Sequence, residues 1–159
     1  MARITTNTTG TQPVIKIGLD GANLANTAAT ITVPFVQDLT ITNSTGVYSY
    51  TTFSDVDMRK LSTPADNEAS TNVVVDSLAY FGNSAATANS APFLGIASLS
   101  TNKNTIDFQI YWNGTDANAY YYEGTGFITS LAPTTSPDAP VWVTPLTIAV
   151  DGTFTVAQV

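Results

Sequence analysis

The stretch Thr105-Ile-Asp-Phe-Gln-Ile-Tyr-Trp-Asn-Gly114 decides the fold class of this chain. Its apolar residues fall at every second position, and only a β-strand places such residues on one face. The stretch ends in Asn-Gly, which favours a tight hairpin turn because both residues tolerate positive φ. Asp107, Gln109 and Tyr111 should face outward. We expect the alternating apolar residues to face a core, namely Ile106, Phe108, Ile110 and Trp112.

Shorter segments with similar patterns lie on both sides of this strand. Turn signals separate them about every 8–12 residues, a spacing typical of all-β domains. Two such turns are expected at residues 43–46 and at Asp151-Gly152, the latter a hairpin candidate. The sequence therefore predicts an all-β, two-sheet sandwich or barrel of about eight or more strands, with at most one short helix. The other expected strands span residues 14–19, 31–35, 39–41, 47–53, 73–81, 92–99, 126–131, 141–150 and 153–156.

Residues 54–71 depart from this pattern, because they are rich in charge and have no sustained apolar period. Loops of this length are usually functional or disordered. We expect a long exposed loop here, within a single domain that spans residues 13–159 and follows an N-terminal arm at residues 1–12. Since such a loop would add nothing to the core, deletion of residues 64–70 should leave the domain folded.

Composition points to a protein whose surface is covered by neighbours. Charged residues make up 11% of the chain, against about 25% in typical soluble domains. The net charge of −7 and only five Lys and Arg residues disfavour tight binding to nucleic acid, which needs clustered cations. An acidic surface that DNA slides past is compatible with these values. A soluble monomer with a neutral polar coat is the alternative interpretation.

The sequence is poorly equipped for catalysis. It has no Cys and no His, which removes disulfides, thiolate nucleophiles and the usual zinc ligands. It also lacks a phosphate-binding Gly loop and a nucleophile elbow. Asp55 and Asp57 could form a hydrolase carboxylate pair or a calcium site, but exposed surface charge is the simpler explanation. Asp107, Asp116 and Glu123 could orient a ligand, but cross-strand hydrogen bonding or an exposed rim is the simpler explanation. We therefore expect no enzyme activity, no cofactor and no metal.

Aromatic residues suggest a second class, a carbohydrate-binding or adhesin sandwich. Tyr120, Tyr121 and Tyr122 must point to alternate sides of a strand, so at least one ring faces outward. An outward ring suits a sugar or a subunit interface. No apolar run is long enough to cross a bilayer, and the N-terminus lacks the apolar segment of a signal peptide. We expect that the protein does not associate with a membrane. We also expect that it is synthesised in the cytosol.

The order of segments in the C-terminal half resembles a known family. After the strand ending in Trp112 come the Asn-Gly turn, the Tyr-Tyr-Tyr-Glu-Gly segment and Gly126-Phe-Ile-Thr-Ser-Leu131. A Pro/Thr/Ser loop and Val143-Thr-Pro-Leu-Thr-Ile-Ala-Val-Asp-Gly152 follow, and Pro92-Phe-Leu-Gly-Ile-Ala-Ser-Leu99 precedes the central strand. This order resembles the tail tube (major tail) proteins of long-tailed bacteriophages. That family has an amphipathic helix on its sheets, for which the sequence shows no clear candidate.

The resemblance implies a structural virion protein that forms hexameric rings, which stack into a tube for DNA ejection. Its partners would be itself, other tail proteins and genomic DNA that passes without tight binding, and its location would be the virion tail after assembly in the host cytoplasm. The loop at residues 54–71 and the arm would contact the next ring. The alternative within virions is a capsid decoration or tail-fibre module. The residues expected at subunit contacts or the lumen are Asp55, Asp57, Arg59, Lys60, Asp66, Glu68, Asp107, Gln109, Tyr111 and Tyr121.

Overall fold

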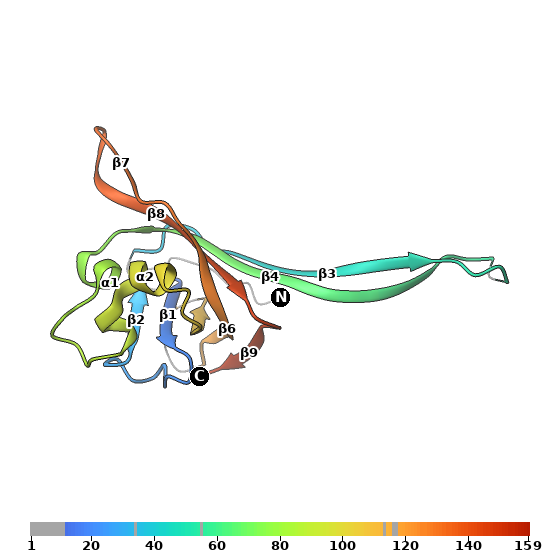
Figure 1. Cartoon of the computed structure of the whole chain (residues 1–159), viewed down its shortest axis with the longest axis horizontal. Coiled ribbons are helices and arrows are strands. Elements are labelled where there is room, and N and C mark those ends of the chain that lie inside the picture. The colour runs from blue at the N-terminus through green and yellow to red at the C-terminus, as the bar shows by residue number, and fades with distance from the viewer. Residues whose placement is uncertain (1–11, 34, 55, 113, 116–117) are drawn as a thin grey trace.

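A computed structural model describes residues 12–33, 35–54, 56–112, 114–115 and 118–159 of the chain. A body of strands and two helices carries a long two-stranded ribbon that extends far to one side (Figure 1). The elements in chain order are β1 Val14–Leu19, β2 Thr30–Val33, β3 Thr40–Tyr50, β4 Arg59–Val74, α1 Ser77–Phe81, α2 Ala91–Thr101, β5 Ile106–Tyr111, β6 Tyr120–Leu131, β7 Thr134–Ser136, β8 Ala139–Val150 and β9 Thr155–Gln158.

The predicted all-β fold is confirmed, but the strands form one sheet where the sequence suggested two. The nine strands are hydrogen-bonded in the antiparallel order β2-β1-β5-β6-β8-β4-β3, with β7 added to β8 and β9 added to β6. Within the described residues β2 and β3 do not pair with each other, so the sheet stays open. Open edges leave backbone N–H and C=O groups available to further strands.

The core lies on one face of this sheet, beneath the two helices. In β5, Ile106, Phe108 and Ile110 are completely buried, as their alternation predicts. Register places Ile15 of β1 opposite Ile110, and Ile17 opposite Phe108. The same face continues through β6 and β8, and α2 packs against it. Removing water from this face is the main stabilising term of the fold.

Residues 91–101 form helix α2, so the strand predicted for residues 92–99 is wrong. Ser90 caps the helix by accepting a hydrogen bond from the Phe93 N–H, and Pro92 occupies the first turn, where no N–H is needed. Gly95 interrupts the helix with a φ of 76°. A short apolar run does not distinguish a strand from a buried helix, and here burial of Ala91, Ile96 and Leu99 against the sheet favours the helix.

Helix α1 also replaces part of a predicted strand, the one expected at residues 73–81. Strand β4 ends at Val74, and the Asp76 carboxylate then accepts hydrogen bonds from the Leu78 and Ala79 N–H groups. This cap starts the helix because it satisfies two donors that have no partner within the first turn. Of its residues Tyr80 reaches the core.

Two predicted turns do not form as expected. Residues 43–46 lie inside β3, where the register shifts between Thr45 and Val47 in place of a turn. After Asp151-Gly152 the chain does not fold back on β8, because β9 continues along the same edge of β6 and pairs with residues 120–123. The Asp151 N–H donates to the Thr125 carbonyl at 2.7 Å, which keeps the chain on that edge. The hairpin prediction at this position is therefore wrong.

Candidate functional site

The ribbon of β3 and β4 is the most unusual feature of the molecule. The two strands pair from Thr40 opposite Ser70 to Tyr50 opposite Arg59. Strand β8 pairs with β4 only from Glu68 onward, so within the described part of the chain residues 44–50 and 59–66 pair with each other and with no third strand. An isolated two-stranded hairpin is marginally stable in water. A ribbon of this length therefore suits a segment that is covered by a partner.

The ribbon corrects the prediction of a long loop at residues 54–71. Strand β4 begins at Arg59, and the connection between the strands is limited to residues 51–58. Deletion of residues 64–70 would not spare the core, because Asn67 and Ala69 are buried. The part of β4 that lies in the ribbon gives a weak sequence signal, because neither face of the ribbon packs on the core. Without one-sided burial, selection does not impose the alternation that marks a half-buried strand.

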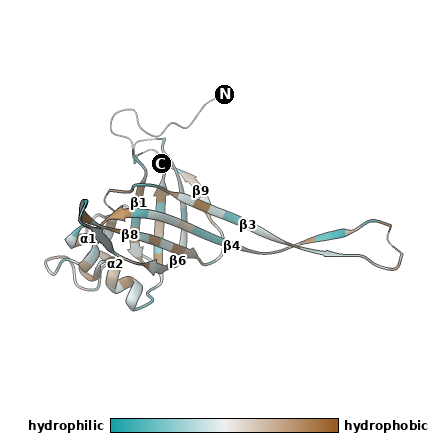
Figure 2. Cartoon of the chain, turned by 90° about the horizontal axis from the view of Figure 1, so that it is seen from above, coloured by the Kyte–Doolittle hydropathy of each residue, from teal (hydrophilic) through white to brown (hydrophobic). Residues whose placement is uncertain are grey.

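One face of the ribbon is aromatic and apolar. Tyr48 lies opposite Leu61, with 60% and 55% of the two residues exposed. Tyr50 is the next residue on that face, and its ring stacks on the Tyr48 ring at a centroid distance of 6.2 Å. The pairing shift places two β4 residues, 63 and 64, opposite Gly46, and so brings Leu61 to the face of Tyr48, which is the face away from the core. Figure 2 shows hydrophilic and hydrophobic segments along the ribbon, which extends away from the body.

The tip of the ribbon carries large apolar side chains with no cover. Phe53 is fully exposed, at 116% of its reference area, and Val56 is exposed to 99%. Met58 is also exposed. Contiguous apolar surface of this kind marks sites that contact a protein or a membrane. The tip is thus a second candidate contact surface, at the end of the ribbon that carries the aromatic face.

A polar network covers the face of the central sheet that points away from the core. Lys16 Nζ lies 5.0 Å from the ring centroid of Tyr111. The Tyr111 hydroxyl donates to Gln109 Oε1 at 3.0 Å, and Gln109 Nε2 donates to Glu123 Oε2 at 3.3 Å. The Tyr121 ring lies 4.9 Å from the Tyr111 ring. These contacts join β1, β5 and β6 on one face and fix the side chains before any partner binds.

Tyr111 corrects one sequence prediction. It lies on the outward face as expected, but only 5% of it is exposed because its neighbours cover the ring. Burial is the main cause of its pKa being raised above 10.0, and the nearby Tyr121 and Glu123 raise the pKa further. Trp112, expected in the core, is half-buried just beyond the end of β5.

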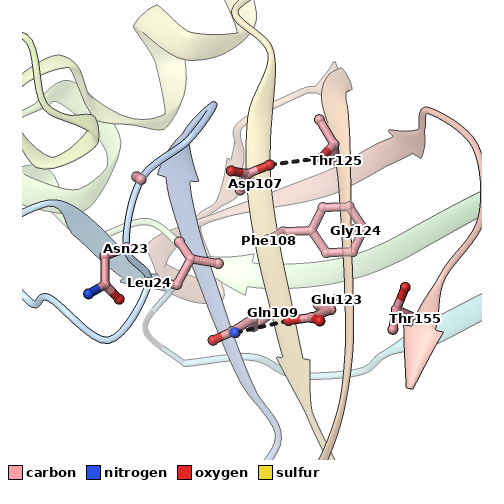
Figure 3. A pocket seen from close by; sticks show the side chains of 10 residues that line it. Asn23, Leu24, Asp107, Phe108, Gln109, Glu123, Gly124, Thr125 and Thr155 are labelled. Carbon is pink, nitrogen blue, oxygen red and sulfur yellow. Dashed lines mark hydrogen bonds between the residues drawn. The ribbon is translucent and has the colours of Figure 1, made fainter. Parts of the chain in front are cut away.

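Asp107 lies on the same face of the sheet, next to this network. Its carboxylate accepts hydrogen bonds from the Gly21 N–H and from Thr125 Oγ1, both at 2.8 Å. The bond to Thr125 and the one between Gln109 and Glu123 run side by side across β5 and β6 (Figure 3). Together with Asn23, Leu24 and Thr155, among others, these residues line a polar hollow of about 390 Å³.

This hollow offers little for catalysis. The Asp107 carboxylate is engaged by the two donors above, and that of Glu123 accepts from Gln109. Among the residues that the structure describes, no three Asp or Glu side chains gather closely enough to hold a metal ion. Within the same part of the chain, no helix is long and apolar enough to cross a membrane.

The predicted contact residues fall into two groups. Asp57, Arg59, Lys60, Asp66 and Glu68 belong to the ribbon and its tip, whereas Asp107, Gln109, Tyr111 and Tyr121 belong to the polar network. Asp55 lies outside the described residues. Strand β8 separates the groups in the sheet.

The most exposed apolar residues of the ribbon were missed by sequence reasoning. The signal available was the placement of Tyr48 and Tyr50 at alternate positions, with charged residues from Asp55 onward. The residues concerned are Tyr48, Leu61, Phe53, Val56 and Met58.

The Tyr triplet does not form an outward aromatic platform. Tyr121 packs on Tyr111, and Tyr122 packs between Trp112 and Phe154 at centroid distances of 5.5 and 5.4 Å. Tyr120 is the exposed member. Stacking on a sugar ring needs free aromatic faces, so the triplet supports packing better than carbohydrate binding.

The fold of this chain is similar to the folds of chains in solved structures of phage-like tail and baseplate particles. One similar chain is in the tail of an empty gene transfer agent (GTA) particle, obtained by helical refinement with C6 symmetry. It has a TM-score of 0.63 and 13% identity, over 91% of this chain and 94% of that chain. A chain in the virion of a native GTA particle has a TM-score of 0.60 and 13% identity, over 92% and 95%.

A third similar chain is in the six-fold symmetrised baseplate of the anti-feeding prophage, with a TM-score of 0.54 and 8% identity over 96% and 97% of the two chains. No protein-family model matches the sequence, and no curated protein does. The fold therefore confirms the resemblance to tail tube proteins that the segment order indicates. Helix α2 packs on the sheet of this chain, although the sequence shows no clear candidate for the amphipathic helix of that family.

Proposed function

We propose that this chain is a structural subunit of a phage-like tail tube, which self-assembles into hexameric rings that stack around a channel for DNA ejection. The observation that carries the proposal is the ribbon, whose aromatic face and apolar tip are exposed among the residues that the structure describes. A monomer would gain nothing from holding these side chains in water. The likeness in fold to a chain from a C6-symmetric GTA tail supports six-fold rings.

The open sheet supplies a means of ring closure. Strand β2 forms one edge, and β9 lies along part of β6 at another. Edges of adjacent subunits that lie side by side would continue the sheet from one subunit to the next, and closure would remove both edges. The polar network would then face the lumen. With Lys16 against Asp107 and Glu123, that face has a net negative charge, so DNA would pass without adhering.

The remaining expectations follow from this role. The subunit would have no enzyme activity and no cofactor, and its location would be the virion tail after assembly in the host cytoplasm. Other tail proteins would bind the terminal rings. Residues 1–12 would contact a neighbouring subunit as an arm.

Electron microscopy of the purified full-length protein tests the proposal. We expect rings or tubes with six-fold averages and a central channel. A protein that stays monomeric at high concentration in sedimentation velocity would overturn the proposal. A variant with the ribbon shortened serves as the matched control, since it should fold but not form tubes.

A further inference from the structure

The sequence contains the dipeptide Asp-Gly twice, and the structure places the two copies in matched surroundings. Asp20-Gly21 follows β1, and Asp151-Gly152 follows β8. All of these residues are exposed, and the two glycines have positive φ, 77° and 95°. A Cβ built on either glycine would meet no atom within 4 Å, so the space beside each dipeptide is open.

The two copies differ in the partner of the glycine N–H. The Gly21 N–H donates to Asp107 Oδ2 at 2.8 Å. Among the residues that the structure describes, the Gly152 N–H has no hydrogen-bond partner, and neither has the Asp151 carboxylate. A hydrogen bond to a carboxylate is roughly twice as strong as one between neutral groups. The Gly21 amide is therefore held by a charged acceptor, whereas the Gly152 amide is open to its own Asp151 side chain.

An exposed Asp-Gly dipeptide can rearrange without an enzyme. The glycine nitrogen attacks the carboxyl carbon of the aspartate, a C–N bond forms, and the amide proton leaves with the carboxyl hydroxyl as water. Water then adds to the former main-chain carbonyl of the succinimide ring and breaks its bond to nitrogen. The product is isoaspartate, in which the main chain runs through the side-chain carbons. Glycine favours the first step because it has no side chain to hinder the approach.

We propose that Asp151 is a site of spontaneous isomerisation to isoaspartate, and that the Asp107 carboxylate protects Asp20 from the same reaction. The attacking nitrogen must give up its proton. At Gly21 that proton is engaged by Asp107, so the attack is opposed, whereas Gly152 has no such restraint among the described residues. The reaction needs water alone and proceeds in the free subunit.

Isomerisation at Asp151 disturbs the connection between β8 and β9. The Asp151 N–H donates to the Thr125 carbonyl at 2.7 Å. On the other side of the reacting peptide, the Gly152 carbonyl accepts from Asn67 Nδ2 at 2.8 Å. An added main-chain carbon lengthens the path between these two bonds, so both cannot keep their geometry. Because Asn67 is buried, loss of its bond leaves an amide without a partner away from water. Strand β9, which begins at Thr155, should therefore loosen from β6.

Peptide mapping of aged protein tests the proposal. Purified full-length protein is kept in mildly acidic buffer, and electron-transfer fragmentation of its peptides distinguishes isoaspartate from aspartate at each position. We expect isoaspartate to accumulate at residue 151 at least about 10-fold faster than at residue 20, because the hydrogen bond to Asp107 opposes the second reaction. In urea-unfolded protein the two rates should be similar. Amide exchange in residues 155–158 should rise in the isomerised fraction.

Two variants separate protection by Asp107 from general stability. Asp107→Ala removes the acceptor of the Gly21 N–H, so the rate at residue 20 should rise toward that at residue 151, which should not change. Thr125→Ala is the matched control, since it removes the other hydrogen bond of the same carboxylate and leaves the Gly21 N–H engaged. Equal rates at the two sites in the folded wild type, or no isoaspartate at residue 151, would overturn the proposal. Unchanged protection of residue 20 in Asp107→Ala would overturn the role of Asp107.

Discussion

Tyr48 and Leu61 lie directly opposite each other on the face of the ribbon that points away from the core. More than half of each residue is exposed, and they are followed by the stacked ring of Tyr50. Cross-strand pairs of this kind stabilise a sheet when a partner or a core covers them. In this chain the pair is exposed, so it contributes fully to stability only when another subunit covers it on assembly.

Replacement of both residues by serine, Tyr48→Ser with Leu61→Ser, should weaken assembly and leave the body folded. Burial of a large apolar side chain contributes about 1.5–3 kcal/mol, so loss of two should raise the critical concentration by at least about 100-fold. Sedimentation velocity measures the assembly, and circular dichroism the fold. Ser49→Ala on the opposite ribbon face is the control. An unchanged critical concentration would show that this face does not lie in an interface.

A shortened ribbon should separate folding from assembly. Replacement of residues 45–65 by Asn-Gly joins the paired Ser44 and Asp66 through a two-residue turn. The buried Asn67 and Ala69 are retained. We expect a cooperative unfolding midpoint close to that of wild type and no tubes in the electron microscope. Deletion of residues 64–70, in contrast, should unfold the protein because it removes part of the core.

Gly95→Ala should strongly destabilise the fold, whereas Gly21→Ala should have a smaller effect. Both glycines have positive φ, 76° and 77°, so each substitution costs about 1–2 kcal/mol in backbone strain. At Gly95 an added Cβ would also overlap the backbone of residues 80–82, whereas at Gly21 it would meet nothing within 4 Å. Overpacking adds about 1–3 kcal/mol. Urea unfolding compares the two variants, and equal losses would contradict the close approach of α1 and α2.

Asp107→Ala should reduce the free energy of unfolding by about 1–3 kcal/mol, because the carboxylate accepts from the Gly21 N–H and the Thr125 hydroxyl. The nearby exposed Asp20→Ala should change the stability by less than about 0.5 kcal/mol. Hydrogen exchange of the Gly21 amide gives a local readout. Unchanged exchange in Asp107→Ala would show that this hydrogen bond does not hold the loop after β1.

Stability should fall at alkaline pH through Tyr111. Its pKa in the folded protein is raised above 10.0, first by burial and then by Tyr121 and Glu123. The unfolded chain therefore loses the phenol proton at lower pH than the folded chain. The contribution to stability is complete below about pH 10 and is lost as the pH rises through the folded-state pKa.

Urea unfolding at about pH 8 and about pH 11 measures this loss. Tyr111→Phe should lower the difference between the two pH values, since the titrating group is removed. Tyr120→Phe, at an exposed position of the triplet, is the control and should keep the wild-type difference. An identical pH dependence in Tyr111→Phe and wild type would contradict the raised pKa.

The core strand β5 and its neighbours could be predicted from the sequence because burial of one face produces an alternation of apolar and polar residues along each strand. Ile106, Phe108 and Ile110 alternate with polar residues, and each is buried as that alternation requires. The segment order of the C-terminal half was also sufficient to indicate the tail-protein fold. Asp107 and Gln109 were correctly assigned to the polar face. The two-residue repeat of apolar residues identifies the strand and also the face on which each side chain lies.

Tertiary structure decided the features that local pattern does not encode. Residues 59–66 form a strand without a core beneath them, so no alternation marked it. Residues 91–101 form a helix because the space above β1, β2 and β6 accepts one, although the apolar run fits either state. After Asp151-Gly152 the chain continues along β6, because that edge of β6 was free to pair with β9. Sequence alone determined which side chains of one strand are buried. The ribbon, a groove at its base and the polar network depend on which distant segments of the chain pack together.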